Sequence, residues 1–142
     1  MVEISGKPGV CDGIPDRQEL RQPALPAALP LVRRMLAGFL GRLNVPATRS
    51  GDIQLAVTEA CANVVRHAYP GGHGDLLCEC EATDDEIVVR VSDWGKSGGR
   101  LPAQHEWGLG IPLIKRLSDH TTQRHTRDGT LVEMHFARSA GL

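Results

Sequence analysis

Three polar residues, Glu59, Asn63 and His67, recur at four-residue spacing within residues 55–68. In a helix this spacing places all three side chains on one face. The other face carries the spacing of a core-facing stripe, formed by Ile53, Val57, Ala60, Cys61, Val64 and Ala68. A carboxylate one turn from a neutral amide can hold a proton acceptor beside an oxygen ligand for a metal ion. A site for a magnesium-bound nucleotide requires this chemistry.

A second polar group stands at the end of a predicted strand, where Asp93 is followed two residues later by Gly95. A carboxylate in this position can accept a hydrogen bond from an exocyclic amine such as that of adenine. The glycine lets the backbone approach a flat ring closely. The alternative is an ordinary turn, which Asp-x-Gly favours when it is taken alone.

Two further glycine-bearing segments follow. Gly108, Leu109 and Gly110 stand directly before a predicted helix, where backbone amides and the helix N-terminus can cradle a phosphate. A flexible hinge is the alternative, because Gly-x-Gly alone is weak evidence. Downstream, Thr130 follows the Asp-Gly pair of a predicted hairpin turn, and its hydroxyl can contact a base.

Hydrophobic periodicity supplies the elements that must position these residues. Apolar residues at helical spacing predict helices from 27 or 31 to 43, from about 48 to 68 and over 110–119, with Thr48 or Ser50 capping the second. Alternation predicts strands over 75–82, 87–91, 121–126 and 131–136, and a short strand over 19–22. This order predicts a two-layer α/β (α+β) sandwich with helices on one face of a mixed, mostly antiparallel sheet.

The bulk composition bounds the function. A chain of 142 residues is one ordinary domain, which we place at 19–138 after a flexible lead-in (1–18) and before a short tail (139–142). A net charge near −1 argues against direct nucleic-acid binding. Without an apolar run of 18 residues or a signal-peptide pattern, we expect a cytoplasmic protein with no membrane segment.

The cysteines lack zinc-ligand spacing, and Cys78 and Cys80 are expected to act as small apolar residues.

The order of these motifs along the chain resembles the GHKL ATPase superfamily, which includes gyrase, Hsp90, histidine kinase and mismatch-repair ATPases. Within it, residues 55–69 (LAVTEACANVVRHAY) and 108–119 (GLGIPLIKRLSD) look like the small anti-sigma-factor serine/threonine kinases of bacterial partner-switching systems. The resemblance covers residues 19–137 and implies the Bergerat ATP-binding fold, with ATP and magnesium as cofactors.

The resemblance also implies roles for the helix residues. Glu59 would be the general base, and Asn63 would supply a side-chain oxygen to magnesium. His67 matches a position that is usually polar near the phosphates, with a structural role as the alternative.

The remaining roles belong to nucleotide binding. By the resemblance, Asp93 reads the adenine amine, Gly95 gives the ring room and Thr130 supports the adenine side. The backbone amides of Gly108, Leu109 and Gly110 would face phosphate. In one departure, Ser97 stands where the broader family has a glycine, which argues more against a histidine kinase than against a serine kinase. A solvated loop is favoured over phosphate contacts for three basic side chains: Lys96, Arg100 and His105.

The implied activity is ATP-dependent phosphorylation of an anti-anti-sigma (STAS-type) protein by a kinase that also sequesters a sigma factor. A homodimer is expected from the family, and the helix near 29–43 offers a sigma or dimer surface unless core packing explains its apolar stripe. The alternative function is a non-catalytic ATP-binding module that switches partner binding with nucleotide occupancy. Histidine-kinase, gyrase-like and Hsp90-like functions would need further domains, for which we expect no room in this chain.

Overall fold

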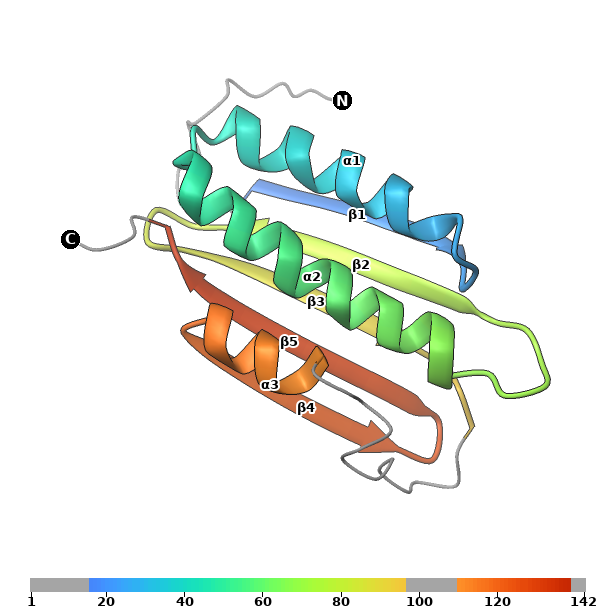
Figure 1. Ribbon diagram of the computed structural model, residues 1–142. Helices are drawn as coiled ribbons and strands as arrows, with labels where there is room; N and C mark the ends of the chain where they lie inside the picture. Colours follow the sequence, from blue (N-terminus) through green and yellow to red (C-terminus); the bar gives the residue numbers. More distant parts are fainter. Residues whose placement is uncertain (1–15, 97–109, 139–142) are drawn as a thin grey trace, which may run out of the picture.

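The computed structural model describes residues 16–96 and 110–138, which form five strands and three helices (Figure 1). The elements in chain order are β1 (Asp16–Pro23), α1 (Ala28–Arg42), α2 (Ala47–His67), β2 (Asp75–Ala82), β3 (Glu86–Asp93), α3 (Gly110–Leu117), β4 (His120–Thr126) and β5 (Gly129–Ala137). Each expected helix and strand is present within these ranges. β1 begins at Asp16, so three residues that we expected in the lead-in are part of the sheet.

The five strands form one sheet in the order β1-β2-β3-β5-β4. All four neighbouring pairs of this described sheet are antiparallel, so it contains no parallel pair, whereas we expected a mixed, mostly antiparallel sheet. The three helices lie on one face of the sheet, with α2 running across its middle (Figure 1). The predicted two-layer α+β sandwich is therefore confirmed.

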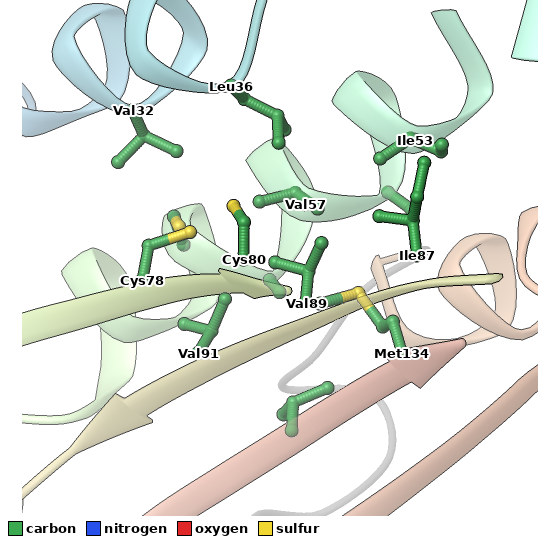
Figure 2. Close-up of a cluster of buried hydrophobic side chains, with 14 of the residues drawn as sticks. Val32, Leu36, Ile53, Val57, Cys78, Cys80, Ile87, Val89, Val91 and Met134 are labelled. Atoms are coloured by element: carbon green, nitrogen blue, oxygen red, sulfur yellow. The ribbon is translucent and has the colours of Figure 1, made fainter. Parts of the chain in front are cut away.

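The hydrophobic core lies between this helical layer and the sheet (Figure 2). Alternation in β2 buries every second residue, and Cys78 and Cys80 accordingly point into the core with Met134 of β5. From the helical side, α2 contributes Ile53 and Val57, which are both fully buried. The amphipathic stripe in the sequence therefore corresponds to the packed face of α2, as its helical spacing predicted.

The start of α2 differs from the prediction. The helix begins at Ala47 after Pro46, whose φ of −56° and ψ of 146° leave it just outside the helix, and no side chain in the described part of the protein caps this end. Thr48 and Ser50 lie inside the helix, where the Ser50 hydroxyl accepts a hydrogen bond of 3.0 Å from Gln54. A proline is well tolerated at a helix start because it lacks the N–H that would need a cap. The sequence rule for caps was therefore wrong here.

The buried cysteines behave as apolar residues. Cys61, Cys78 and Cys80 are all buried and free of disulfides, and the Cys80 sulfur lies 3.9 Å from that of Met35. Hydrogen bonding to Cys61 and burial raise the pKa of Cys78, and a bond to Cys78 with burial raises that of Cys80. Both thiols therefore stay protonated, in agreement with the expectation for Cys78 and Cys80.

A buried arginine joins the first turn of α2 to the C-terminal end of β5. Arg49 is only 8% exposed, and its Nε donates a 2.9 Å hydrogen bond to the carbonyl of Ala137. Its guanidinium also pairs with Asp119, at the junction between α3 and β4. These contacts fix where α2 crosses the sheet. None of the helices described is both long and apolar enough to cross a membrane.

The sheet face away from the helices carries a network of charged side chains. Arg90 of β3 donates to Glu81 at 2.9 Å and to Glu133 at 2.6 Å. His135 of β5 extends the network, at 2.9 Å from Glu133 and 3.2 Å from Glu86. Directly opposed charges of opposite sign stabilise neighbouring strands of a sheet.

Candidate functional site

A pocket lies between the second half of α2 and the sheet, with about 470 Å³ of empty space. Its helical side is formed by residues within the last three turns of α2 and just after it, namely Ala60, Asn63, Val64, His67 and Ala68. Its sheet side is formed by residues of the three strands farthest from β1 and by one residue after β3, namely Val91, Asp93, Gly95, His125, Thr130 and Val132. Mostly apolar walls with a few polar groups are typical of a small-molecule site.

Three polar residues cross the sheet side of the pocket in one row. Asp93 of β3 pairs with Thr130 of β5, and Thr130 pairs with His125 of β4. Directly opposite residues on neighbouring antiparallel strands have their side chains on the same face. The row therefore places a carboxylate, a hydroxyl and an imidazole side by side beneath α2.

The carboxylate of Asp93 is held in place by backbone amides. Its Oδ1 accepts a 2.9 Å hydrogen bond from the Gly95 N–H, and the Thr130 N–H also donates to the carboxylate. Burial raises the pKa of Asp93 above its ordinary value, although these two bonds and the nearby His125 act to lower it. A fixed and largely desolvated acceptor between apolar walls is suited to an exocyclic amine on a flat ring.

On the helical side, Asn63 carries an unsatisfied polar atom. Its side chain is buried, at 2% exposure, and its Oδ1 accepts a 3.0 Å hydrogen bond from Arg66. Its Nδ2 is buried and has no hydrogen-bond partner among the described residues. An orphaned buried donor is costly, so a native structure that keeps one invites a ligand, ion or water as its partner.

The two neighbours of Asn63 on the polar stripe differ in their relation to the pocket. His67 lines it, one turn closer to the end of α2. Glu59 is half-buried one turn before Asn63 and is not among the residues that line the pocket. The predicted stripe thus runs from the wall of the pocket at His67 and Asn63 to Glu59, whose backbone lies about 6 Å from that of Asn63 along the helix axis.

Gly95 closes the pocket where β3 meets the end of α2. A Cβ at this position would lie 2.0 Å from the carbonyl oxygen of Ala68, which only a glycine avoids. Next to it, the Tyr69 hydroxyl accepts a 2.9 Å bond from the Trp94 N–H and donates a 2.5 Å bond to the Asp75 carbonyl. The end of α2 is therefore bound directly to the ends of β2 and β3 that frame the site.

The structure brings together Asn63, His67, Asp93, Gly95 and Thr130 from the set that the sequence singled out. Gly110 begins α3, but Gly108 and Leu109 lie outside the described residues, as do Ser97, Arg100 and His105. Lys96 is exposed and does not line the pocket.

Sequence reasoning missed His125, although a usable signal was present. The turn Arg127-Asp128 joins β4 to β5 so that Thr126 pairs with Gly129. A two-residue hairpin loop fixes the register of both strands. Counting one step back from this turn places His125 opposite Thr130.

Comparison with known proteins gives consistent matches over most of the chain. The family model described as "Histidine kinase-like ATPase domain" matches residues 22–136. The serine-protein kinase RsbW of Halalkalibacterium halodurans is 33% identical over 137 residues, covering 86% of this chain and 84% of that protein. The serine-protein kinase RsbW of Bacillus subtilis is 30% identical over 136 residues, covering 84% of each.

One solved structure shares the fold. The crystal structure of the RsbU and RsbW domains of Rv1364c from Mycobacterium tuberculosis superposes with a TM-score of 0.67. The match covers 88% of this chain and 34% of that chain, at 21% sequence identity. At this identity the match carries information about the fold alone.

Proposed function

This chain belongs to the family of histidine kinase-like ATPase domains, as the order of its motifs predicted, and we propose that it is an ATP-dependent serine/threonine-protein kinase that acts as an anti-sigma factor. The observation that carries the proposal is the pocket between α2 and the sheet, where Asp93, Thr130 and Asn63 meet. It is supported by relatives named serine-protein kinase that are 30–33% identical over most of their length.

The row of polar groups on the sheet would hold the adenine. Asp93 is a fixed hydrogen-bond acceptor in the wall of the pocket, and Thr130 lies next to it. Val91 and Val132 flank these groups with apolar surface on which a ring can pack. In this arrangement the exocyclic amine of adenine donates to the Asp93 carboxylate.

Asn63 is suited to the magnesium end of the nucleotide. Protein-bound Mg²⁺ takes oxygen ligands and combines one or two of them with the phosphates and water. The Oδ1 of Asn63 would be such a ligand, but it accepts a hydrogen bond from Arg66, so that guanidinium must move or share the oxygen. When bound, Mg²⁺ would neutralise charge on the phosphates. The orphaned Nδ2 of Asn63 can then donate to the nucleotide.

Glu59 would act as the general base. It takes the proton from the hydroxyl of the partner's serine or threonine, whose oxygen forms a bond to the γ-phosphorus of ATP while ADP leaves. Glu59 is half-buried one helical turn from Asn63, so a hydroxyl brought to the phosphate end of the site comes within its reach. No described residue forms a hydrogen bond or ion pair with its carboxylate, which leaves it available for this proton.

The proposed partners are two proteins. A STAS-type anti-anti-sigma protein would receive the phosphoryl group, and a sigma factor would be sequestered. On α1, Arg33 and Arg34 are exposed and offer a basic surface for a sigma factor or a second copy of this chain.

The test is transfer of labelled phosphate from Mg-ATP to purified anti-anti-sigma protein. We expect Glu59→Gln to lower the transfer rate by about 10²- to 10⁴-fold, because a general base contributes about that much. Glu79→Gln is a matched control, since Glu79 is also half-buried but lies on β2. Transfer that persists in Glu59→Gln would show that Glu59 is not the base.

A second candidate function is supported by the hydrogen bond that the Asn63 side chain already accepts from Arg66. Its Oδ1 is already bonded to Arg66, and Glu59 stands outside the pocket, which would also suit a module that binds ATP without transferring phosphate. Such a module would bind its partner differently with and without Mg-ATP while leaving the partner unphosphorylated. Measuring partner affinity and phosphorylation in the same reaction separates the two functions.

A further inference from the structure

A hollow with about 540 Å³ of empty space lies at the end of the sheet where β4 turns into β5. Its lining includes two small residues, Ser92 and Gly129, and three larger ones, Trp94, Arg124 and Leu131. The small residues leave open space that the larger ones surround. None of these five residues lines the pocket beneath α2, so the hollow is a separate feature of the surface.

The hollow opens on the sheet face away from the helices. Ser92 of β3 pairs with Leu131 of β5, and each stands next to a residue of the nucleotide pocket, Asp93 or Thr130. Because successive residues of a strand point to opposite faces, the side chains of Ser92 and Leu131 point away from α2. Arg124 pairs with Leu131 and shares this face. The hollow and the nucleotide pocket therefore lie back to back on the two faces of the sheet.

Trp94 supplies a large apolar surface to the hollow and is 42% exposed. Arg21 stacks over its ring, with the guanidinium carbon 4.5 Å from the ring centroid, and Asp75 holds Arg21 at 3.0 Å. The ring is thus oriented before a partner arrives, which lowers the entropic cost of binding. Tryptophan and arginine are enriched among the residues that carry most of the binding energy of protein interfaces.

Basic groups outnumber acidic ones around the hollow. Arg124 is exposed, and its guanidinium forms no hydrogen bond or ion pair with a described residue. Two more exposed basic residues, Lys96 and Arg127, stand within two residues of Trp94 and Asp128 in the sequence. Asp128 is the acidic side chain of the turn beside the hollow. This surplus of positive charge is complementary to an acidic partner.

The rest of the same sheet face limits how far the acidic part of a partner can extend. Glu79 and Glu133 flank Arg90 in the row of paired residues nearest the hollow. Acidic side chains outnumber the basic one in that row, so it would repel a polyanion or an anionic membrane surface lying across the whole sheet. A short acidic segment confined to the hollow avoids this repulsion.

We propose that the hollow is a docking site for a protein segment in which an acidic residue stands next to a large apolar residue. The apolar side chain enters the hollow against Trp94 and Leu131, and the acidic side chain pairs with Arg124. This site faces away from the nucleotide pocket and does not depend on the proposed function.

The probe is a library of random dodecapeptides displayed on phage. The library is first depleted on the double variant Trp94→Ala/Arg124→Glu and then selected on the wild-type chain. We expect the enriched peptides to carry an aspartate or glutamate beside a large apolar residue. In fluorescence polarisation, a labelled peptide of this kind should bind about tenfold more weakly to each single variant than to the wild type.

Arg17→Glu and Leu55→Ala are the matched controls. Arg17→Glu makes the same change of charge at an exposed position of β1, and Leu55→Ala removes an apolar side chain of similar exposure, 46%, from α2. Both variants should bind the selected peptide like the wild type. If Trp94→Ala fails to fold, Arg124→Glu serves for the depletion and the binding test, because Arg124 lies exposed on an edge strand.

Three results overturn the inference. One is a selection that enriches no peptide, or only peptides without an acidic residue. Another is a selected peptide that binds Arg124→Glu as tightly as the wild type. The third is a wild-type dimer in sedimentation velocity that Arg124→Glu dissociates, because a second copy of this chain would then cover the hollow. None of these results bears on phosphate transfer, which tests the proposed function separately.

Discussion

The substitution Gly95→Ala probes the contact that closes the pocket. The added Cβ would lie 2.0 Å from the carbonyl oxygen of Ala68 and 2.8 Å from its carbonyl carbon. Because real Cβ contacts are not shorter than 3.0 Å, the end of α2 and the end of β3 must separate by about 3.0 − 2.0 = 1.0 Å. Both obstructing atoms are backbone, so no side-chain rotation relieves the clash.

Forced insertion into a packed site costs about 1–3 kcal/mol, and a clash with backbone should reach the upper end of that range. We therefore expect Gly95→Ala to lower the free energy of unfolding by about 3 kcal/mol, which shifts the midpoint of urea denaturation by about 1–2 M. The same displacement moves Asp93 relative to Asn63, so ADP affinity should fall as well.

Gly51→Ala is the matched control for this substitution. Apart from the adjoining residues and backbone of α2 itself, no atom of the described residues lies within 4 Å of a Cβ built on Gly51, which is exposed inside α2. Alanine there should raise the free energy of unfolding by about 0.5–1 kcal/mol through helix propensity and leave ADP affinity unchanged. An unfolding midpoint for Gly95→Ala equal to that of the wild type would refute the close approach of β3 to α2.

Three further predictions concern charge. Because burial raises the pKa of Asp93, ADP affinity should decline on acidification at a pH above that of an ordinary aspartate, while Asp93→Asn should bind weakly at every pH in the same titration. Arg66→Gln frees the Oδ1 of Asn63, so the gain in ATP affinity on adding Mg²⁺ should be larger than in the wild type; an unchanged gain would contradict the competition. Burial acts to lower the pKa of His135, but hydrogen bonds to Glu133 and Glu86 outweigh it and the pKa is raised. The stability that His135 contributes should thus be full below about pH 6.5 and be lost as pH rises through the raised value, a dependence that urea denaturation of His135→Gln should lack.

Local patterns were sufficient to predict the elements of the fold. Strict alternation in β2 and the apolar stripe of α2 reflect burial on one face, which is a property of neighbouring residues. The position of β5 between β3 and β4 could not be predicted in this way. It depends on contacts between strands that are separated along the chain by α3.

The site was predicted only where its residues follow a local pattern. Asn63 and His67 share a helical face, and Asp93 ends a strand, so their spacing already carried the signal. The contact of Gly95 with Ala68 is a meeting of two elements, and the sequence alone suggested only room for a ring. The bond from Arg66 to Asn63 was also missed, because an arginine on a helix surface ordinarily points to solvent.

The central claim is that Asp93 reads the amine of an adenine nucleotide in the pocket beneath α2. Calorimetric titration of Mg-ADP into the wild-type chain and into Asp93→Asn tests it most directly, with circular dichroism to confirm that both are folded. We predict one binding site in the wild type and a loss of about 10- to 100-fold in Asp93→Asn, the value of a buried hydrogen bond to a charged group. Equal affinity in the two proteins, or no heat in the wild type, would contradict the account.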